Sequence, residues 1–218
     1  MELRELITIV RNELDDATQP YLWSDQELIE YFADGENEAA RRARLLIDSS
    51  TAAICTITVI AGTAEYPLDS RVLFIRRVLL DGDKIQRASY RDLDANISKW
   101  QTQQGVISHF VTDLNTNKLR VYPIPLVAGT LNMTVVRLPL ADMNAPDDEP
   151  ELKLHYQRSL RFWAMYRAYM KQDTETFNKG RAEDALALFE QEFGKKSSAQ
   201  DEEWIEREQA QDAYSGAY

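Results

Sequence analysis

The sequence predicts a mixed α+β fold, in which an antiparallel helical bundle is built from both chain ends and a small antiparallel β-domain is inserted between them. Three observations predict it. Apolar residues recur at helical spacing near both ends of the 218-residue chain, and with a period of two in the middle. The segment Leu152–Gly194 carries more aromatic surface than one partner helix could cover. Helices from the two ends are therefore expected to pack on each other.

Two helices are predicted for residues 1–49. The first follows a stripe of apolar residues at helical spacing and ends before Thr18–Pro20. Ser24 and Glu27 form a capping box, in which each side chain bonds the backbone amide of the other residue. The second helix is therefore expected to begin at about Asp25 and to end at about Ile47.

The second helix contains two features that each allow two interpretations. Gly35 costs about 1 kcal/mol relative to alanine in a helix, so it is either a tolerated defect or a point of close helix approach. The arginines Arg41, Arg42 and Arg44 follow the acidic stretch Glu27–Glu38. They either pair with acids of their own helix or meet the carboxylates of a neighbouring copy in a ring.

Residues 50–147 are predicted to form the inserted antiparallel β-domain. Apolar Cys55, Ile57 and Val59 alternate with threonines, as in a strand with one buried face. Asp81–Gly82 is typical of a two-residue hairpin turn. Strands are expected at Cys55–Val59, Tyr66–Leu68, Val72–Leu80, Lys84–Ile85, His109–Leu114, Lys118–Tyr122 and Thr130–Leu138, with one helical stretch at Tyr90–Trp100.

Residues 148–194 are predicted to add two more helices after the proline-rich linker Pro139–Pro150. Asp148 lies three residues before Glu151 and is expected to cap the first of them. The helical sequences LHYQRSLRFWAMYRAYMKQ and FNKGRAEDALALFEQEFG are expected to join at Asp173–Thr174 almost without a loop. Aromatic residues in surplus on the first helix are candidates for contacts between copies: Trp163, Tyr166 and Tyr169.

Residues 195–218 differ in character from the rest of the chain. After Gly194 the sequence is polar and acidic, with isolated large apolar side chains. Composition alone favours a solvated terminus, whereas spaced aromatic residues on an extended arm also suit docking into pockets of a partner. The candidate anchors of such an arm are Trp204, Ile205, Tyr214 and Tyr218.

Composition and charge limit the possible functions. The formal net charge of −11 opposes tight, sequence-independent binding of phosphates, so double-stranded DNA is expected to pass by without specific binding. The single Cys55 cannot form an intramolecular disulfide and is expected to be a small buried apolar residue. No early segment is typical of a signal peptide, and no uncharged apolar run is long enough to span a bilayer. We expect a folded protein of intracellular type.

No catalytic residue, metal site or cofactor is predicted. His109 and His155 have no Cys, His or acid at a spacing typical of metal ligands. The sequence contains no GxSxG, P-loop, GxGxxG or CxxC motif. The acidic pairs Asp147–Asp148 and Glu202–Glu203 lie on a turn and in the tail, where burial that would separate their pKa values is not expected.

Four segments, taken in order, carry a resemblance to a known family: LWSDQELIEYFADGENEAARRARLL, VLFIRRVLLDG, LRVYPIPLVAGTLNMTVVRLPL and LHYQRSLRFWAMYRAYMKQDTETFNKGRAEDALALFEQEFG. In their pattern of apolar and aromatic positions they resemble the head-to-tail adaptor (connector) proteins of tailed bacteriophages. The likeness extends to about Gly194 and involves no invariant site.

The resemblance implies a structural protein of the virion neck, assembled in the host cytoplasm, in a ring of twelve copies below the portal protein. Such a ring extends the DNA channel used in genome ejection and offers a platform for tail or nozzle proteins. It also implies that residues 195–218 reach into the portal. Two alternatives remain: a virion-associated cell-wall hydrolase with a buried carboxylate in the β-domain, or another tail or neck completion protein or packaging regulator.

Overall fold

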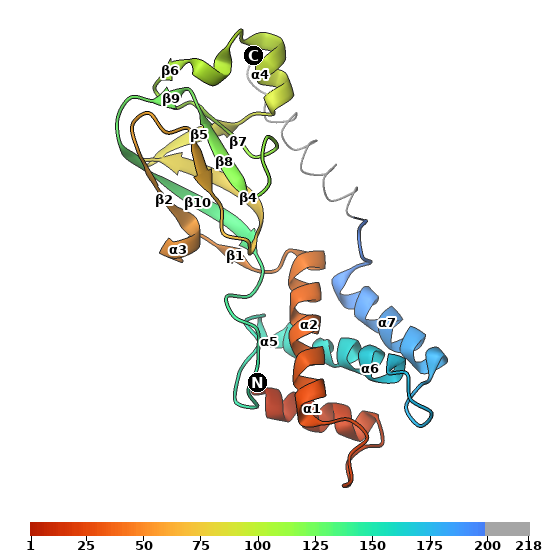
Figure 1. Cartoon of the computed structure of the whole chain (residues 1–218). Helices are drawn as coiled ribbons and strands as arrows, with labels where there is room; N and C mark the ends of the chain where they lie inside the picture. Colours follow the sequence, from red (N-terminus) through yellow and green to blue (C-terminus); the bar gives the residue numbers. More distant parts are fainter. Residues whose placement is uncertain (199–218) are drawn as a thin grey trace. The chain divides into compact units, whose positions relative to one another are not determined.

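The computed structural model describes residues 1–198 and has a mixed α+β fold (Figure 1). The chain divides into two compact units. Residues 1–46 and 138–196 form one, which we call the helical unit, and residues 47–137 form the other, the β unit. The chain therefore leaves the helical unit once, builds the β unit, and returns.

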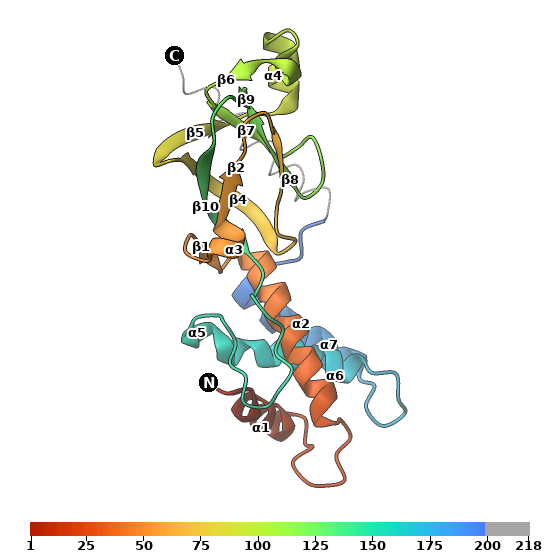
Figure 2. The same ribbon diagram turned by 60° about the vertical axis from the view of Figure 1, so that its left-hand side comes forward.

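The helical unit joins both parts of the chain around one hydrophobic core. Figure 2 shows the helices of the first part (red to orange) beside those of the second (cyan to blue). α6 packs against α2 and α7, and α1 packs against α2 and α6. Helices from both parts of the chain are thus in contact. The elements are α1 (Leu3–Glu13), α2 (Asp25–Ala43), α5 (Leu154–Gln157), the 3₁₀ turn η2 (Arg158–Leu160), α6 (Arg161–Met170) and α7 (Lys179–Phe193).

The capping box that starts α2 is confirmed, but the predicted end of this helix is wrong. The Ser24 side chain accepts from the Glu27 amide, and the Glu27 carboxylate accepts from the Ser24 amide at 2.9 Å. Arg44 takes the left-handed conformation with φ 51° and closes the helix after Ala43. Ile47 then belongs to a strand of the β unit. The helix was predicted too long because apolar spacing alone does not show where the backbone reverses.

The helical sequence that begins at Leu154 starts where it was predicted, but the predicted cap at Asp148 is wrong. Asp148 does not cap a helix; its carboxylate accepts from the amides of Asn144 and Ala145 and closes a turn in the linker. The first helical turn begins at Leu154, and its N-cap residue, Lys153, makes no side-chain cap hydrogen bond. An acid before an apolar run therefore marked a turn and not a helix start.

The predicted tight junction at Asp173–Thr174 is also wrong, because residues 171–178 form a loop between α6 and α7. The loop is held by its own hydrogen bonds: the Thr176 hydroxyl donates to the Lys171 carbonyl, and the Asn178 amide donates to the Tyr169 carbonyl. The Asn178 side chain accepts from the Arg181 amide and caps α7. This asparagine cap was the signal in the sequence for the later helix start.

Gly35 marks a close approach of α2 and α6, which decides between the two interpretations given above. A Cβ atom at this position would lie 3.1 Å from the Trp163 Cβ atom and 3.1 Å from its Cδ1 atom. The indole of Trp163 occupies the space that a side chain at position 35 would need. The glycine is therefore a packing requirement of the helical unit.

The β unit is a curled sheet in the strand order β1-β10-β4-β5-β7-β8-β3, with β2 also beside β10 and a separate pair β6-β9. Its core holds apolar residues of β2, β4, β5, β8 and β10. The elements are β1 (Ile47–Asp48), α3 (Ala52–Cys55), β2 (Thr56–Val59), β3 (Glu65–Pro67), β4 (Val72–Leu80), β5 (Asp83–Arg87), α4 (Tyr90–Asn96), η1 (Trp100–Thr102), β6 (Gln104–Gly105), β7 (His109–Val111), β8 (Lys118–Tyr122), β9 (Ile124–Pro125) and β10 (Gly129–Arg137).

Most predicted strands are present, and two expectations are corrected. Residues 52–55 form the short helix α3, so Cys55 ends a helix instead of starting a strand, although it is buried as expected. The sheet is also not wholly antiparallel, since β5 pairs with β7 and β6 with β9 in parallel. The hairpin at Asp81–Gly82 is confirmed, with φ 49° and 101° at its two turn residues.

A buried ion pair joins the two places where the chain enters and leaves the β unit. The Asp48 carboxylate on β1 lies 2.7 Å from the Arg137 Nε atom at the end of β10, and both side chains are buried. Asp48 also accepts from the amides of Ser50 and Thr51 and from the Thr51 hydroxyl. Burial alone would raise the pKa of Asp48, but these hydrogen bonds together hold it well below its usual range.

Candidate interaction surfaces

The aromatic side chains predicted to contact other copies lie mostly within the helical unit itself. Trp163 and Tyr169 are buried, and Tyr166 is half-buried. The Trp163 ring lies 5.0 Å from that of Phe189 and 5.3 Å from that of Tyr166, measured between centroids. Much of the aromatic surplus seen in the sequence is therefore covered by helices of the same chain.

The three candidate arginines of α2 differ in their surroundings. The Arg42 side chain is only 4% exposed and lies over the rings of Trp163 and Phe189, with its guanidinium carbon 5.2 Å and 5.3 Å from their centroids. Arg41 and Arg42 both bind the Glu38 carboxylate at 2.8 Å. Pairing with acids of the same chain therefore holds for these two. Arg44 is half-buried at the end of α2.

One end of the β unit presents apolar side chains on three neighbouring loops. Gly105 pairs with Pro125, and the Pro125 carbonyl accepts from the Gly62 amide, which brings the loops together. Val106 is 82% exposed and Val127 74% exposed. We call this surface the apolar tip, and its large apolar residues are Ile60, Val106, Leu126 and Val127. Exposed apolar side chains gathered in this way are typical of contact surfaces.

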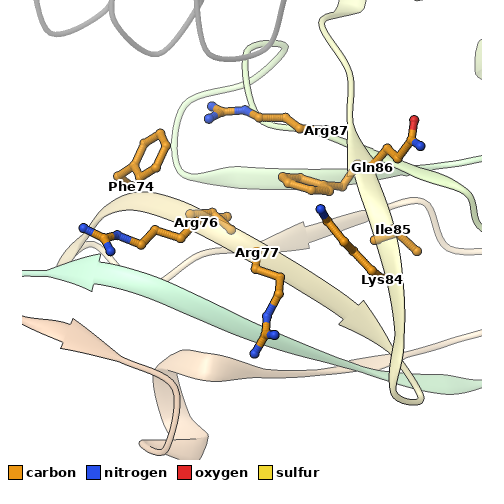
Figure 3. A pocket seen from close by; sticks show the side chains of 9 residues that line it. Phe74, Arg76, Arg77, Lys84, Ile85, Gln86 and Arg87 are labelled. Atoms are coloured by element: carbon orange, nitrogen blue, oxygen red, sulfur yellow. The ribbon is translucent and has the colours of Figure 1, made fainter. Parts of the chain in front are cut away.

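A second surface of the β unit is a groove between β4 and β5. The two strands pair only through Val78–Leu80 and Asp83–Ile85, and β5 then continues beside β7. Beyond this point a hollow of about 340 Å³ opens between them, with Phe74 and Phe110 among its lining residues (Figure 3). A smaller hollow of about 100 Å³ shares Phe74 and Arg87 with it and extends to Lys118. We call the two hollows together the basic groove.

The basic groove is lined by cations and, within residues 1–198, by no carboxylate. Arg87 donates to the Thr112 hydroxyl at 2.8 Å and lies over the Phe74 ring. Arg76, Arg77 and Lys84 are exposed and make no hydrogen bond or ion pair with any described residue. The cations of the larger hollow, which Figure 3 labels, are Arg76, Arg77, Lys84 and Arg87.

A β-bulge explains why two successive arginines of β4 are both exposed. Ile75 pairs with Val135 and Arg77 with Thr134, which leaves Arg76 as the extra residue. Ile75 and Val78 are therefore both buried, although strict alternation would put them on opposite faces. The apolar run predicts this strand but not a cationic surface on it; two adjacent arginines inside an apolar run of an acidic protein were the available signal.

Neither histidine lines the basic groove or belongs to the apolar tip. His109 is half-buried, its Nδ1 atom lies 2.8 Å from the Ser108 hydroxyl, and burial lowers its pKa. His155 is exposed and lies beside the Tyr156 ring. Across residues 1–198, no three His, Cys, Asp or Glu side chains gather in a group that could hold a metal ion. None of the helices in that range is long and apolar enough to cross a membrane.

The four residues named as anchors of the arm, Trp204, Ile205, Tyr214 and Tyr218, lie outside the described residues. Their role, like that of the residues named for contacts between copies, stays a prediction. The surfaces that the structure does describe are an apolar tip and a basic groove, both on the β unit. Both are suited to holding another polypeptide segment.

Comparison with known proteins gives one result for the whole chain. The family model described as "SU10 adaptor protein" matches residues 1–213, which include both units. A search among curated proteins found no match. A match of this extent supports a structural adaptor protein of a phage, in agreement with the family resemblance of the sequence. This chain belongs to the SU10 adaptor protein family.

Proposed function

We propose that this protein is a head-to-tail adaptor that binds the portal ring and extends the DNA channel toward the tail. The family match over residues 1–213 carries this proposal. In it, residues 1–49 and 148–194 form an antiparallel helical bundle, residues 50–147 form the β-domain, and residues 195–218 form an extended arm. Twelve copies make a ring in the neck of the virion, assembled in the host cytoplasm.

Contacts between copies are assigned to the helical unit. Arg41, Arg44 and Tyr166 are half-buried and keep surface on the outside of this unit, whereas Arg42, Trp163 and Tyr169 support them from within. A neighbouring copy would meet the exposed parts with its own carboxylates. The formal net charge of −11 further suits a channel wall, because it repels the DNA backbone and lets the duplex pass without specific binding.

Binding to the portal is assigned to the arm. Trp204, Ile205, Tyr214 and Tyr218 are the large apolar residues of an otherwise polar segment. Trp and Tyr are frequent anchors at interfaces because each buries a large surface and keeps one polar atom for a hydrogen bond.

The test of this assignment is native mass spectrometry of the chain mixed with portal rings. Trp204→Ala/Tyr214→Ala should weaken the complex by on the order of 1000-fold, since two anchor residues at about 2 kcal/mol each contribute about 4 kcal/mol. The matched control Gln209→Ala/Gln211→Ala changes polar residues of the same arm and should bind as the unaltered chain does. A complex that survives deletion of residues 195–218 would contradict the arm assignment.

Contact with tail or nozzle proteins is assigned to the apolar tip of the β unit. Val106 and Val127 are its most exposed apolar residues and come from loops that backbone hydrogen bonds join through Pro125. Covering them would remove apolar surface from water, the main favourable term in association. The tip is therefore the part of the β unit best suited to a protein partner.

Val106→Asp/Val127→Asp tests this contact in particle assembly. Heads that carry the altered adaptor should still contain it but should fail to attach tails, as seen by electron microscopy. Thr116→Asp places one such negative charge in an exposed turn elsewhere in the β unit and should leave tail attachment intact. Normal tail attachment with both tip substitutions would show that tails bind another surface.

The alternative of a cell-wall hydrolase requires an acid in an apolar cleft of the β unit. Among the described residues of this unit, the buried acid is Asp48, and its hydrogen bonds hold it ionised beside Arg137. That arrangement opposes a role as general acid. Turnover of peptidoglycan that is lost in one carboxylate variant would favour the hydrolase over the adaptor.

A further inference from the structure

We propose that the basic groove of the β unit binds the acidic segment 201–212 of the same chain. This inference goes beyond the proposed function, because it concerns the protein before it meets the portal. It assigns to the groove a ligand chemistry, an extended acidic peptide with an aromatic residue. It also gives the arm a second binding place, within its own molecule.

The charge distribution along the chain is the first support. Residues 47–137 carry ten Lys and Arg against eight Asp and Glu, a net charge of +2 in a protein whose total is −11. Residues 201–212 carry six acids and one arginine. A strongly acidic segment and a net positive unit are thus on one chain. Opposite charges of this kind favour association and fix its orientation.

The chemistry of the groove is the second support. Arg76, Arg77 and Lys84 expose their charged groups without a carboxylate partner in residues 1–198, and no Asp or Glu lines either hollow. Arginine binds carboxylates through two parallel hydrogen bonds, which a peptide with adjacent acids can satisfy. The half-buried ring of Phe74 adds an apolar contact surface for a side chain such as Trp204.

The shape of the groove favours a peptide over nucleic acid. It opens where β4 and β5 separate, so one wall is a strand, and an extended segment can lie along it. The larger hollow has about 340 Å³, enough for one or two side chains and too little for a duplex. The surrounding protein is acidic, which opposes wider contact with a phosphate backbone.

Covalent connection favours the segment of the same chain over that of another copy. A segment tethered by a short flexible linker reaches a local concentration in the millimolar range, far above the protein concentration in a dilute sample. Binding in the groove would shield the acids and Trp204 before assembly. A portal ring would then have to displace the segment from the groove, so that the groove and the portal compete for one arm.

A disulfide trapping experiment on the full chain tests the proposal without portal present. In Lys84→Cys/Glu203→Cys, the two new thiols should form an intrachain disulfide in a buffer with oxidised glutathione, which is itself reduced to two thiols by exchange. A tethered segment with a Kd of about 0.1 mM at a local concentration of about 1 mM is bound in about ten molecules out of eleven. The two thiols are then held near each other in most molecules, so the disulfide should form faster than in an unbound pair. The native Cys55 is buried and stays in place.

Two control variants define the expected pattern. Lys179→Cys/Glu203→Cys places the first thiol on the exposed face of α7, outside the groove, and gives the rate for an unbound pair. Arg76→Glu/Arg77→Glu added to the Lys84→Cys pair should lower the rate to that level, and further addition of Glu202→Lys/Glu206→Lys should restore it. Arg91→Glu/Lys99→Glu makes the same charge change in the β unit outside the groove and should have no effect.

Three results would overturn the proposal. The first is equal rates for the groove pair and the α7 pair. The second is a disulfide-linked dimer as the main product, which would assign the segment to a second copy. The third is tight binding of duplex DNA that Arg76→Glu/Arg77→Glu abolishes, together with equal disulfide rates; the groove would then be a nucleic-acid site. None of these results depends on portal binding, so the proposed function is tested separately.

Discussion

The two units of this protein differ in the side chains that they leave exposed. In the helical unit, aromatic rings and an arginine pack between helices: Trp163 fills the space beside Gly35, and Arg42 lies over Trp163 with only 4% of its side chain exposed. The β unit also buries aromatic rings and the guanidinium of Arg137, but it leaves cations such as Arg76 and apolar side chains such as Val106 exposed. The helical unit is acidic, with 14 Lys and Arg against 22 Asp and Glu, whereas the β unit has a net charge of +2.

The comparison shows that a surplus of aromatic residues in a sequence need not be exposed on the surface of the folded protein. The aromatic segment of α6 suggested contacts between copies, yet most of its rings are needed to join the two halves of the helical unit. The β unit gave no such signal and presents the more open surfaces. An inserted unit that need not close the core of its host is free to carry contact surfaces. The following predictions test whether the stability of one unit depends on the other.

The largest effect is expected from Asp48→Ala, which leaves the buried guanidinium of Arg137 without its carboxylate. Removing one partner of a buried ion pair costs about 3–5 kcal/mol. The β unit should unfold at lower denaturant concentration, and its amides should exchange faster with solvent. Amides of α2, α6 and α7 should keep their protection if the units are stable separately. Hydrogen exchange by mass spectrometry measures both units in one sample.

Asp69→Ala is the matched control, because the Asp69–Arg71 pair lies in the same unit but is partly exposed. Exposed ion pairs contribute about 0–1 kcal/mol. Loss of protection in both units with Asp48→Ala would show that the helical unit depends on the β unit. The two units would then differ in their exposed surfaces but would not be stable independently of each other.

The next effect is a pH dependence that belongs to the helical unit. Glu36 on α2 is buried and accepts from the amides of Glu151 and Leu152. Burial raises its pKa from 4.5 to about 7, despite these hydrogen bonds. The folded state therefore binds this proton more tightly than the unfolded state. The stabilising contribution is fully present below pH 4.5 and is lost as the pH rises through 7.

Glu36→Gln isolates this contribution, since the amide stays neutral at every pH. The unaltered protein should lose about 3 kcal/mol of unfolding free energy relative to the variant between pH 4.5 and pH 8, following a shift from 4.5 to about 7. Urea unfolding at several pH values measures the difference. Parallel pH profiles for the two proteins would show that Glu36 has an ordinary pKa.

Much of the fold could be predicted from the sequence where the physics is local. The capping box at Ser24 and Glu27 and the hairpin at Asp81–Gly82 depend on neighbouring residues only, and both are confirmed. The strand at Val72–Leu80 was predicted with its correct ends. The end of α2 was missed because the left-handed conformation of Arg44 depends on how the chain turns into the β unit.

The candidate surfaces were harder to predict, because they arise from pairing between distant segments. The basic groove exists since β5 leaves β4 to pair with β7, and no local pattern shows that change of partner. The bulge at Arg76 likewise depends on the pairing of Ile75 with Val135 on β10. The apolar residues of the tip are ordinary loop positions in the sequence. Their loops become neighbours through the hydrogen bond from the Gly62 amide to the Pro125 carbonyl, which joins distant segments.

A third prediction concerns the close approach at Gly35. Gly35→Leu would place a side chain where the Trp163 atoms lie 3.1 Å from the first added carbon, and overpacking of this kind costs about 1–3 kcal/mol. The loss should appear in thermal unfolding of the helical unit. Gly180→Ala is the control, because the nearest atom lies 3.7 Å away and alanine favours the helix by up to about 1 kcal/mol. A stable Gly35→Leu protein would mean that α2 and α6 can separate without cost.

The smallest effect is expected for two adjacent arginines of α2, of which Arg42 is buried and Arg41 is more exposed. Arg42→Ala removes a stem and guanidinium packed on Trp163 and Phe189 and should cost about 1–2 kcal/mol, because cation–π contacts gain strength where water is excluded. Arg41→Ala removes a more exposed partner of Glu38 and should cost less than about 1 kcal/mol. Urea unfolding gives this order. If Arg41 instead serves contacts between copies, its substitution will change ring formation and leave monomer stability nearly unaltered, whereas Arg42→Ala acts on stability first. Equal stability losses for the two variants would contradict the assignment of Arg42 to the interior.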